Sequence, residues 1–441
     1  MNLSSLKNIF LNNECSLLYV KKLSPNDNSK NQVYLGSSFD ILNIFPISDI
    51  KSEEAGRWEK ERFKAKIKFS WINEEGLLSE APNTQFILYP KYPEVRFSGF
   101  LKGSANAPSE LMAKRLAGRV LFLSISSNRE ILGYVASPQE EVAGEFLEQK
   151  ELEEHGVFSV IKLSIIENSR TTLLNELLRI HELKWITSKK LSSDGEILPC
   201  NYSNCGGYTL EAELGVTPNS HSEPDFMGWE IKQFNVKDFS KLNSSIITLM
   251  TPEPTDGIYK THGVEYFIRN YGYPDKKGRI DRMNFGGIHK SNKVHPTTKL
   301  EMRLIGYDMV SGKIRNVNGK IALIDQHENE AASWSFSSLL KHWNRKHDKA
   351  CYVPSRLENF TKRNYYYGNK VILGTGTDFQ LFLREMALGN IYYDPGIKLE
   401  NASKNPKVKK RSQFRIKTRH IYELYKKYEI INLVNDYNQD S

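Results

Sequence analysis

The first 138 residues consist mainly of short strand-like runs separated by polar turns. Such runs occur at Ser16–Lys21, Phe63–Ser70, Gln85–Leu88 and Arg119–Ile125, and the turns between them are rich in Asn, Ser, Gly and Pro. Short strands separated by turns of this composition are typical of β-barrels and β-sandwiches. Residues 1–138 are therefore predicted to form an all-β domain.

An acidic segment follows this β-rich region. Residues 140–154 contain seven Glu and one Lys, with no Pro, and Gly156 comes soon after them. This composition favours a helix, and we interpret residues 139–160 as an acidic connector between two domains. The alternative is an ordinary surface helix within one domain.

The remaining residues, 161–441, have the mixed pattern of an α/β domain. Apolar positions recur at helical spacing in Thr171–Trp185, which is rich in good helix formers. Further along, Lys320–Ile324 and Lys370–Leu373 have strand character, and Ser335–Trp343 has helical character. We therefore predict an α/β domain preceded by the all-β domain.

Composition restricts the class of protein. Of the 441 residues, 39% are hydrophobic and 11% are aromatic, which favours a folded chain over a disordered one. No run of about 18 apolar residues occurs, and Asn12, Asn13 and Glu14 interrupt the first residues before a signal-peptide core can form. Four cysteines in a chain of this length make no disulfide framework. We therefore expect a protein of the reducing cytoplasm.

Positive charge is concentrated towards the end of the sequence. Residues 404–427 contain ten Lys and Arg against one acid, Glu423, so this segment accounts for the whole formal charge of +9. A basic segment in an otherwise neutral chain favours binding to a polyanion. A solvated basic tail is the alternative.

The order of residues within this segment favours an ordered strand over a solvated tail. Two kinds of side chain alternate, and alternate positions of a strand share one face. Arg suits the major-groove edge of guanine and Gln that of adenine, so we expect the polar face to read DNA bases. The packable face would carry Ser412, Phe414, Ile416 and Thr418, and the polar face would carry Arg411, Gln413, Arg415, Lys417 and Arg419.

Acidic residues and a lysine near the middle of the chain have a spacing that suits a metal-dependent site. Asp225 is followed after four residues by Glu230, Ile231 and Lys232. On a strand, Glu230 and Lys232 share one face, while Trp229 and Ile231 point into the core. Carboxylates on a half-buried strand are costly to desolvate unless a cation or a substrate uses them, and their oxygens suit Mg²⁺. The alternative is a surface strand with an ordinary charge pair.

A short helix just before this segment offers a further carboxylate. Leu210 and Leu214 have helical spacing and are expected to face the core, and Gly215 is the expected end of the helix. Glu211 lies next to Leu210 and is expected to reach the same cation. Glu213 is the less favoured choice.

Glu211, Asp225, Glu230 and Lys232, in this order and spacing, resemble the active site of MvaI/BcnI-type restriction endonucleases, a branch of the PD-(D/E)xK nuclease fold. The resemblance extends from about residue 165 to the end of the sequence. It implies that Asp225, Glu230 and Ile231 hold Mg²⁺, that Lys232 serves the attacking water, and that Glu211 completes the acidic site.

The same resemblance implies a function and its partners. It implies a type II site-specific deoxyribonuclease that cuts double-stranded DNA at a short GC-rich pseudopalindrome such as CCWGG, leaving a 5′-phosphate and a 3′-hydroxyl. It also implies a monomer that acts in the prokaryotic cytoplasm beside a cognate DNA methyltransferase.

Two polar loops of the β-rich region, Lys22–Asp27 with the residues after it and Tyr92–Gly103, carry a second resemblance. They resemble the DNA-embracing arms of EcoRII-type effector domains, which are β-pseudobarrels related to plant B-three domains. The resemblance implies a second DNA-binding site, as in type IIE enzymes, and leaves open whether that site activates or inhibits cleavage. Ordinary polar turns are the alternative. The expected DNA contacts are Ser24, Asn26, Asp27, Lys30, Gln32, Arg96, Ser98 and Lys102.

Two rival functions remain open from the sequence. One is a DNA-binding regulator with a retained but inactive nuclease fold, which the complete set of acids and the lysine disfavours. The other is a repair nuclease that acts at mismatches or lesions, although two DNA-reading modules favour a fixed recognition site. Among other residues, His342 and His347 are expected on the surface of a helix, and Cys200 and Cys205 lack the further ligands of a zinc site.

Overall fold

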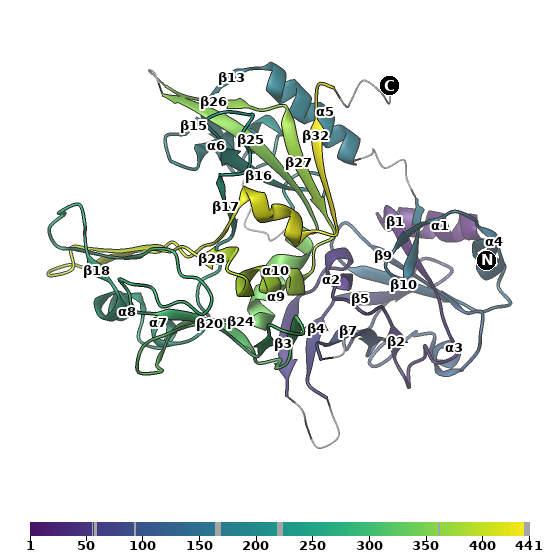
Figure 1. The fold of residues 1–441 in the computed structure, drawn as a ribbon. Coiled ribbons are helices and arrows are strands. Elements are labelled where there is room, and N and C mark those ends of the chain that lie inside the picture. The colour runs from purple at the N-terminus through teal and green to yellow at the C-terminus, as the bar shows by residue number, and fades with distance from the viewer. Residues whose placement is uncertain are drawn as a thin grey trace. The chain divides into compact units, whose positions relative to one another are not determined.

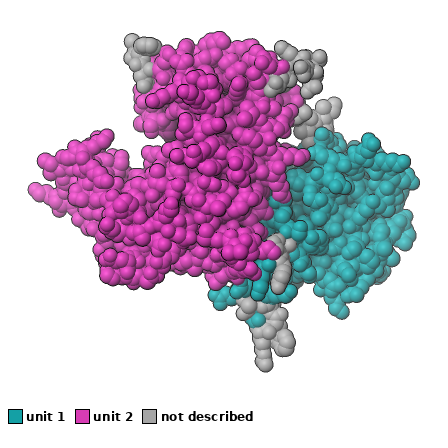
Figure 2. Space-filling model, viewed as in Figure 1, with its two compact units in different colours: residues 1–167 teal, residues 168–441 magenta. Residues whose placement is uncertain are grey.

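The chain divides into two compact units, Met1–Glu167 and Asn168–Ser441, which Figures 1 and 2 show as ribbon and space-filling views. Both units combine helices with sheets, so the fold is mixed α/β. In the part of the chain that is described, no helix has both the length and the apolar character needed to cross a membrane. The computed structural model describes residues 1–54, 56, 60–91, 94–163, 169–217, 224–359 and 362–435.

Unit 1 contains two sheets in which most neighbouring strands are antiparallel. The seven-stranded sheet has the order β11-β12-β1-β9-β10-β5-β6, and the five-stranded sheet has the order β2-β8-β7-β4-β3. The strands are β1 (Leu17–Lys22), β2 (Val33–Tyr34), β3 (Asp49–Glu53), β4 (Arg62–Lys66), β5 (Phe69–Ile72), β6 (Leu78–Glu80), β7 (Gln85–Tyr89), β8 (Glu94–Ser98), β9 (Val120–Ile125), β10 (Ile131–Ala136), β11 (Glu153–His155) and β12 (Phe158–Lys162).

A hydrophobic core joins helices of unit 1 to its seven-stranded sheet. Phe10 of α1, Phe122 of β9 and Phe146 of α4 are buried in one cluster. The rings of Phe122 and Phe146 meet edge to face, with centroids 5.9 Å apart. The helices are α1 (Leu3–Asn12), α2 (Ile41–Ile44), α3 (Ser109–Ala113) and α4 (Glu141–Glu148).

The structure places residues 139–160, expected to be a connector, within unit 1. Helix α4 buries Val142, Ala143 and Phe146, because these apolar residues lie on one side of an otherwise acidic helix. Strand β12 then pairs with β1, and β11 pairs with β12, so the segment extends the sheet of unit 1. A surface helix within one domain, the alternative considered for this segment, describes it better than a linker.

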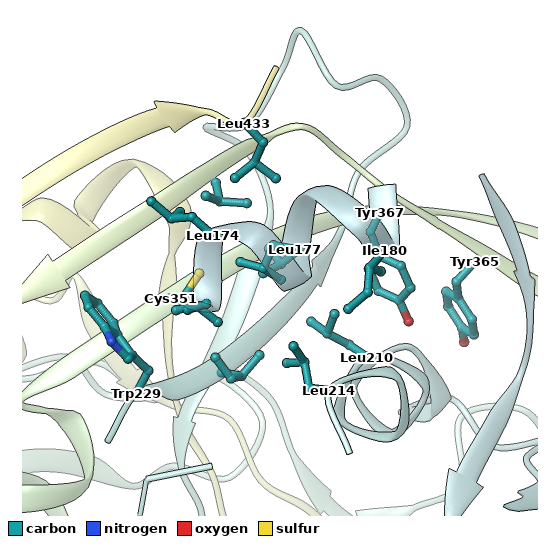
Figure 3. Packing of buried hydrophobic residues seen from close by; sticks show 14 of the residues in the cluster. Leu174, Leu177, Ile180, Leu210, Leu214, Trp229, Cys351, Tyr365, Tyr367 and Leu433 are labelled. Carbon is teal, nitrogen blue, oxygen red and sulfur yellow. The ribbon is translucent and has the colours of Figure 1, made fainter. Parts of the chain in front are cut away.

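The central sheet of unit 2 has the order β13-β26-β25-β27-β32, with β16 paired in parallel to β25. Helices α5 and α6 pack against it, and Leu177 of α5 and Leu210 of α6 enter one core with Trp229 and Cys351 (Figure 3). These elements are α5 (Ser169–Glu182), β13 (Trp185–Thr187), α6 (Cys205–Glu213), β16 (Glu230–Asn235), β25 (Lys349–Asn359), β26 (Arg363–Tyr367), β27 (Lys370–Thr375) and β32 (Lys427–Asn432).

Smaller sheets and five helical segments complete unit 2 within the described residues. One sheet has the order β17-β31-β28 and carries the basic segment, because β31 is its middle strand. The remaining elements are β14 (Lys189–Leu191), β15 (Ile197–Pro199), β17 (Ile246–Met250), α7 (Ile258–Thr261), α8 (Val264–Tyr271), β18 (Tyr273–Pro274), β19 (Arg282–Gly286), β20 (Glu301–Ile305), β21 (Tyr307–Asp308), β22 (Lys313–Ile314), β23 (Lys320–Ile324), β24 (Glu330–Ser335), α9 (Phe336–His347), α10 (Phe379–Ala387), β28 (Ile391–Tyr393), β29 (Gly396–Glu400), β30 (Lys407–Lys409), β31 (Phe414–Lys417) and the 3₁₀ helix η1 (Thr418–Leu424).

The local elements expected around the acidic residues are confirmed. Helix α6 buries Leu210 and Leu214, and Gly215 follows with a φ of +72°, a backbone conformation that glycine adopts without strain. Trp229 and Ile231 are buried in the core on one side of β16. A disulfide between Cys200 and Cys205 at the start of α6 was not expected from the sequence.

Candidate active site

A tight turn brings Asp225 next to Glu230. Phe226 and Trp229 exchange two backbone hydrogen bonds of 2.8 and 2.9 Å, and the two residues between them, Met227 and Gly228, both have positive φ. Asp225 therefore precedes the turn and Glu230 follows it. The backbone N–H of Ile231 donates to Oδ2 of Asp225 at 2.9 Å, which fixes this carboxylate against the start of β16.

Glu230 is a buried carboxylate held between two lysines. Its side chain is 1% exposed, while that of Lys232 on the same strand is 22% exposed. Nζ of Lys232 donates a hydrogen bond to Oε1 of Glu230. Nζ of Lys346, from α9, lies 3.5 Å from Oε2, and that oxygen accepts no hydrogen bond within the described part of the chain. The second lysine was not expected from the sequence.

Helix α6 adds Glu211 to this group. Burial, with the charge of Asp225 second, raises the pKa of Glu211 to about 7. Burial, with the charge of Glu230 second, raises the pKa of Asp225 to about 6. Burial alone would lower the pKa of Lys232, but Glu230, Asp225 and Glu211 together outweigh this effect and raise that pKa, so the lysine stays charged. Three carboxylates therefore share a site in which their negative charges repel one another.

Two of these four residues line a cleft of about 500 Å³. Glu211 and Lys232 line it, together with Lys346 and His342 of α9 and Arg415 of β31. The structure thus brings two of the predicted catalytic residues and one residue of the basic segment into a single cleft. Glu213, the less favoured acid, instead pairs with Lys189 at 2.6 Å.

Comparison with models of protein families shows which family the chain matches. Residues 174–425, more than half of the sequence, match the model of the MvaI/BcnI restriction endonuclease family. The chain belongs to this family. It is accordingly a type II site-specific DNA endonuclease.

Solved structures of the MvaI restriction endonuclease are also similar to the chain. One is a complex with cognate DNA, at 19% identity with a TM-score of 0.45, covering 60% of this chain and 99% of that one. Another is MvaI without DNA, at 19% identity with a TM-score of 0.33, covering 61% of this chain and 99% of that one. A search of curated proteins finds no match.

Enzymes of the MvaI/BcnI family use divalent metal ions, and the acidic residues of this chain fit such an ion. The donor atoms are carboxylate oxygens, which suit a hard cation. Oε2 of Glu230 is buried without a hydrogen bond, and burial followed by the neighbouring carboxylates raises the pKa values of Glu211 and Asp225, which a bound cation would oppose. Within the described residues, no three His, Cys, Asp or Glu side chains are already arranged as a metal site, and both carboxylate oxygens of Glu230 lie next to a lysine Nζ.

The basic segment of this family member has the expected alternation over a shorter strand. Ser412, Phe414, Ile416 and Thr418 are buried, whereas β31 covers only Phe414–Lys417. On the opposite face, Arg411, Lys417 and Arg419 are exposed. Two members of that face differ in their surroundings: Arg415 is half-buried and pairs with Asp394 at 2.6 Å, and Gln413 is buried and accepts a hydrogen bond from Thr248 at 3.3 Å.

Helix α9 supplies the cleft with Lys346, which the sequence did not indicate, and with His342, which was expected only as a surface residue. Lys346 and His342 are four residues apart and so lie on one side of the helix. The available signal was this spacing within the segment HWNRKH, of which only the histidines were considered. The expectation of a surface histidine is wrong for His347, because its ring packs on Trp343 and both ring nitrogens lie within 3.0 Å of backbone carbonyls.

In unit 1 the two predicted DNA-binding loops lie side by side. Strand β2 pairs with β8, and Nε2 of Gln32 donates to Oγ of Ser98 at 3.1 Å. Asp27 is buried and pairs with Lys21 at 3.2 Å, so its carboxylate holds the loop together. Arg96 pairs with Glu94. Tyr92 and Pro93 lie outside the described residues. Of the predicted DNA contacts, four are exposed: Ser24, Asn26, Lys30 and Lys102.

Proposed function

We propose that this chain is a Mg²⁺-dependent restriction endonuclease that hydrolyses double-stranded DNA at a short GC-rich pseudopalindrome such as CCWGG. The observation that carries the proposal is one cleft in which Glu211 and Lys232 face the solvent beside Asp225 and the buried Glu230. Three carboxylates with a charged lysine provide the oxygen ligands for a hard cation and a donor for a water or a phosphate.

Each residue has a role in this proposal. Asp225, Glu230 and the backbone carbonyl of Ile231 would hold Mg²⁺, which when bound stabilises negative charge on the phosphate and acidifies water. Lys232 stays charged beside Glu230, so it can donate a hydrogen bond to the attacking water and orient it. Glu211 accepts a proton more readily than an ordinary carboxylate, since its pKa is about 7. Hydrolysis leaves a 5′-phosphate and a 3′-hydroxyl.

The basic segment would read the DNA sequence next to the site of cleavage. Arg415 lines the same cleft as Lys232, and its ion pair with Asp394 leaves further guanidinium donors for a base or a phosphate. Lys417 and Arg419 are exposed beyond it and suit phosphate contacts. Arg411 and Gln413 extend this segment on the other side, although Gln413 would have to leave Thr248 to reach a base.

Unit 1 would bind a second copy of the site, as in a type IIE enzyme. We assign it a B-three-like pseudobarrel fold on the resemblance of its two loops, which β2 and β8 place side by side. Lys30 and Lys102 would contact phosphates, because both are exposed on these loops. The whole enzyme would act as a monomer beside a cognate methyltransferase in a prokaryotic cytoplasm.

Digestion of a fully sequenced plasmid tests the proposal. The enzyme is incubated with Mg²⁺ or with EDTA, Asp225→Ala serves as the inactive control, and the product ends are sequenced. Discrete fragments that share one motif at their ends, formed only with Mg²⁺ and the native enzyme, are the expected result. Random nicking would support a repair nuclease instead, and tight duplex binding without cleavage would support a regulator.

A further inference from the structure

Helix α9 fixes a lysine at the edge of the cleft. Trp343 is fully buried and its Nε1 donates to Oγ1 of Thr377 at 3.1 Å, so one side of the helix is anchored in the core. His347, also buried, lies next to Lys346 in the sequence, and its Nε2 lies 3.0 Å from the carbonyl oxygen of Leu249. The helix is therefore fixed at Trp343 and at His347, on either side of Lys346. The side chain of Lys346 lines the cleft.

Lys346 and Lys232 differ in how they contact Glu230. Nζ of Lys232 donates a hydrogen bond to Oε1 of Glu230. Lys346 lies 3.5 Å from Oε2 without forming a hydrogen bond, and within the described residues no other acid pairs with it. Its 29% exposed side chain therefore keeps its N–H donors available on the cleft side.

The net charge of the cleft indicates why a second ammonium group would favour binding of a phosphate. Three carboxylates, two lysines and one divalent cation leave a net charge of about +1 facing a phosphodiester, whose negative charge increases in the transition state. Without Lys346 the same group would be neutral. A fixed ammonium at this position therefore supplies the charge that complements the phosphate.

We propose that Lys346 is a second phosphate-binding cation of the active site. In the free enzyme it lies against Oε2 of Glu230, and when DNA binds it donates to a non-bridging oxygen of the scissile phosphate. The proposal rests on the proposed function of the cleft. It assigns Lys346 a direct contact with the substrate rather than a role as a structural counter-ion.

The test compares Lys346→Met and Lys346→Arg with Lys341→Met, an exposed lysine of the same helix outside the cleft lining. Affinity for a duplex with the site found by plasmid digestion is measured in EDTA at several KCl concentrations. Lys346→Met should make the slope of log affinity against log salt shallower by about 0.9, the effect of one lost phosphate contact. Single-turnover cleavage with Mg²⁺ should fall on the order of 10²-fold. Lys346→Arg should keep the native salt slope and the native cleavage rate. Lys341→Met should change neither of these two quantities.

Several results would overturn the proposal. An unchanged salt slope in Lys346→Met, with or without a lower melting temperature, would make Lys346 only a counter-ion of Glu230. An equal effect in Lys341→Met would indicate a general charge effect. If the Met variant does not fold, Lys346→Gln carries the same expectation. Cleavage by Asp225→Ala would refute the proposed function of the cleft itself, and that result is independent of the Lys346 measurements.

Discussion

Replacing Asp225 by Asn should stabilise the metal-free protein at pH 8 while abolishing cleavage. Burial, and then the charge of Glu230, raise the pKa of Asp225 from 3.8 to about 6. At 1.36 kcal/mol per pKa unit, the ionised carboxylate costs the folded state up to about 3 kcal/mol. Asn retains an oxygen that can accept the hydrogen bond from the N–H of Ile231, so the variant removes the charge and keeps the contact.

The pH dependence of this gain follows from the direction of the shift. The folded state binds the proton of Asp225 more tightly than the unfolded state does, so the native enzyme loses stability as pH rises from about 4 to about 6. The advantage of the Asn variant should therefore be complete above pH 7, at about 1–3 kcal/mol, and reduced by about half at pH 5.

Urea unfolding in EDTA at pH 5 and pH 8 measures both values. Asp238→Asn is the matched control, since hydrogen bonds from Ser240 lower the pKa of that exposed carboxylate and its loss should shift stability the other way. Mg²⁺ should stabilise the native enzyme more than Asp225→Asn. An Asn variant no more stable than the native protein at pH 8, or a gain that does not shrink at pH 5, would refute the reasoning.

Three further predictions concern cleavage and recognition. Lys232→Met should reduce single-turnover cleavage by at least 10²-fold with duplex affinity in Ca²⁺ changed only a few-fold; lost binding would mean that the lysine is structural. Arg415→Ala should lose about 1–3 kcal/mol of discrimination at one base pair, measured by competition between site variants. Lys417→Ala should instead weaken binding to all sequences alike. The reverse pattern would contradict these assignments. A fragment of residues 168–441 should still cut the plasmid, and a folded but inert fragment would show that unit 1 is obligatory.

Features that depend on near neighbours in the chain could be predicted from the sequence. The helix that carries Glu211 and the strand that carries Glu230 and Lys232 follow from the spacing of apolar residues, which must face a core. The alternation of packable and polar residues around β31 also depends only on near neighbours in the chain. Membership of the MvaI/BcnI family was confirmed by the match over residues 174–425, whereas the roles of the individual acidic residues stay a prediction.

Features that depend on distant segments were decided only by the tertiary structure. Lys346 meets Glu230 because β16 pairs with β25, the strand that follows α9, and neither segment has a local pattern that specifies the other. His347 is likewise buried by a distant segment, because its Nε2 lies 3.0 Å from the carbonyl of Leu249 in β17. Residues 139–160 join unit 1 because the apolar side of α4 needs a partner sheet, although composition alone resembles a linker. The sequence therefore determined which residues carry the functional groups for metal binding and catalysis. Long-range packing determined which of them share one low-dielectric cleft, where their pKa values shift.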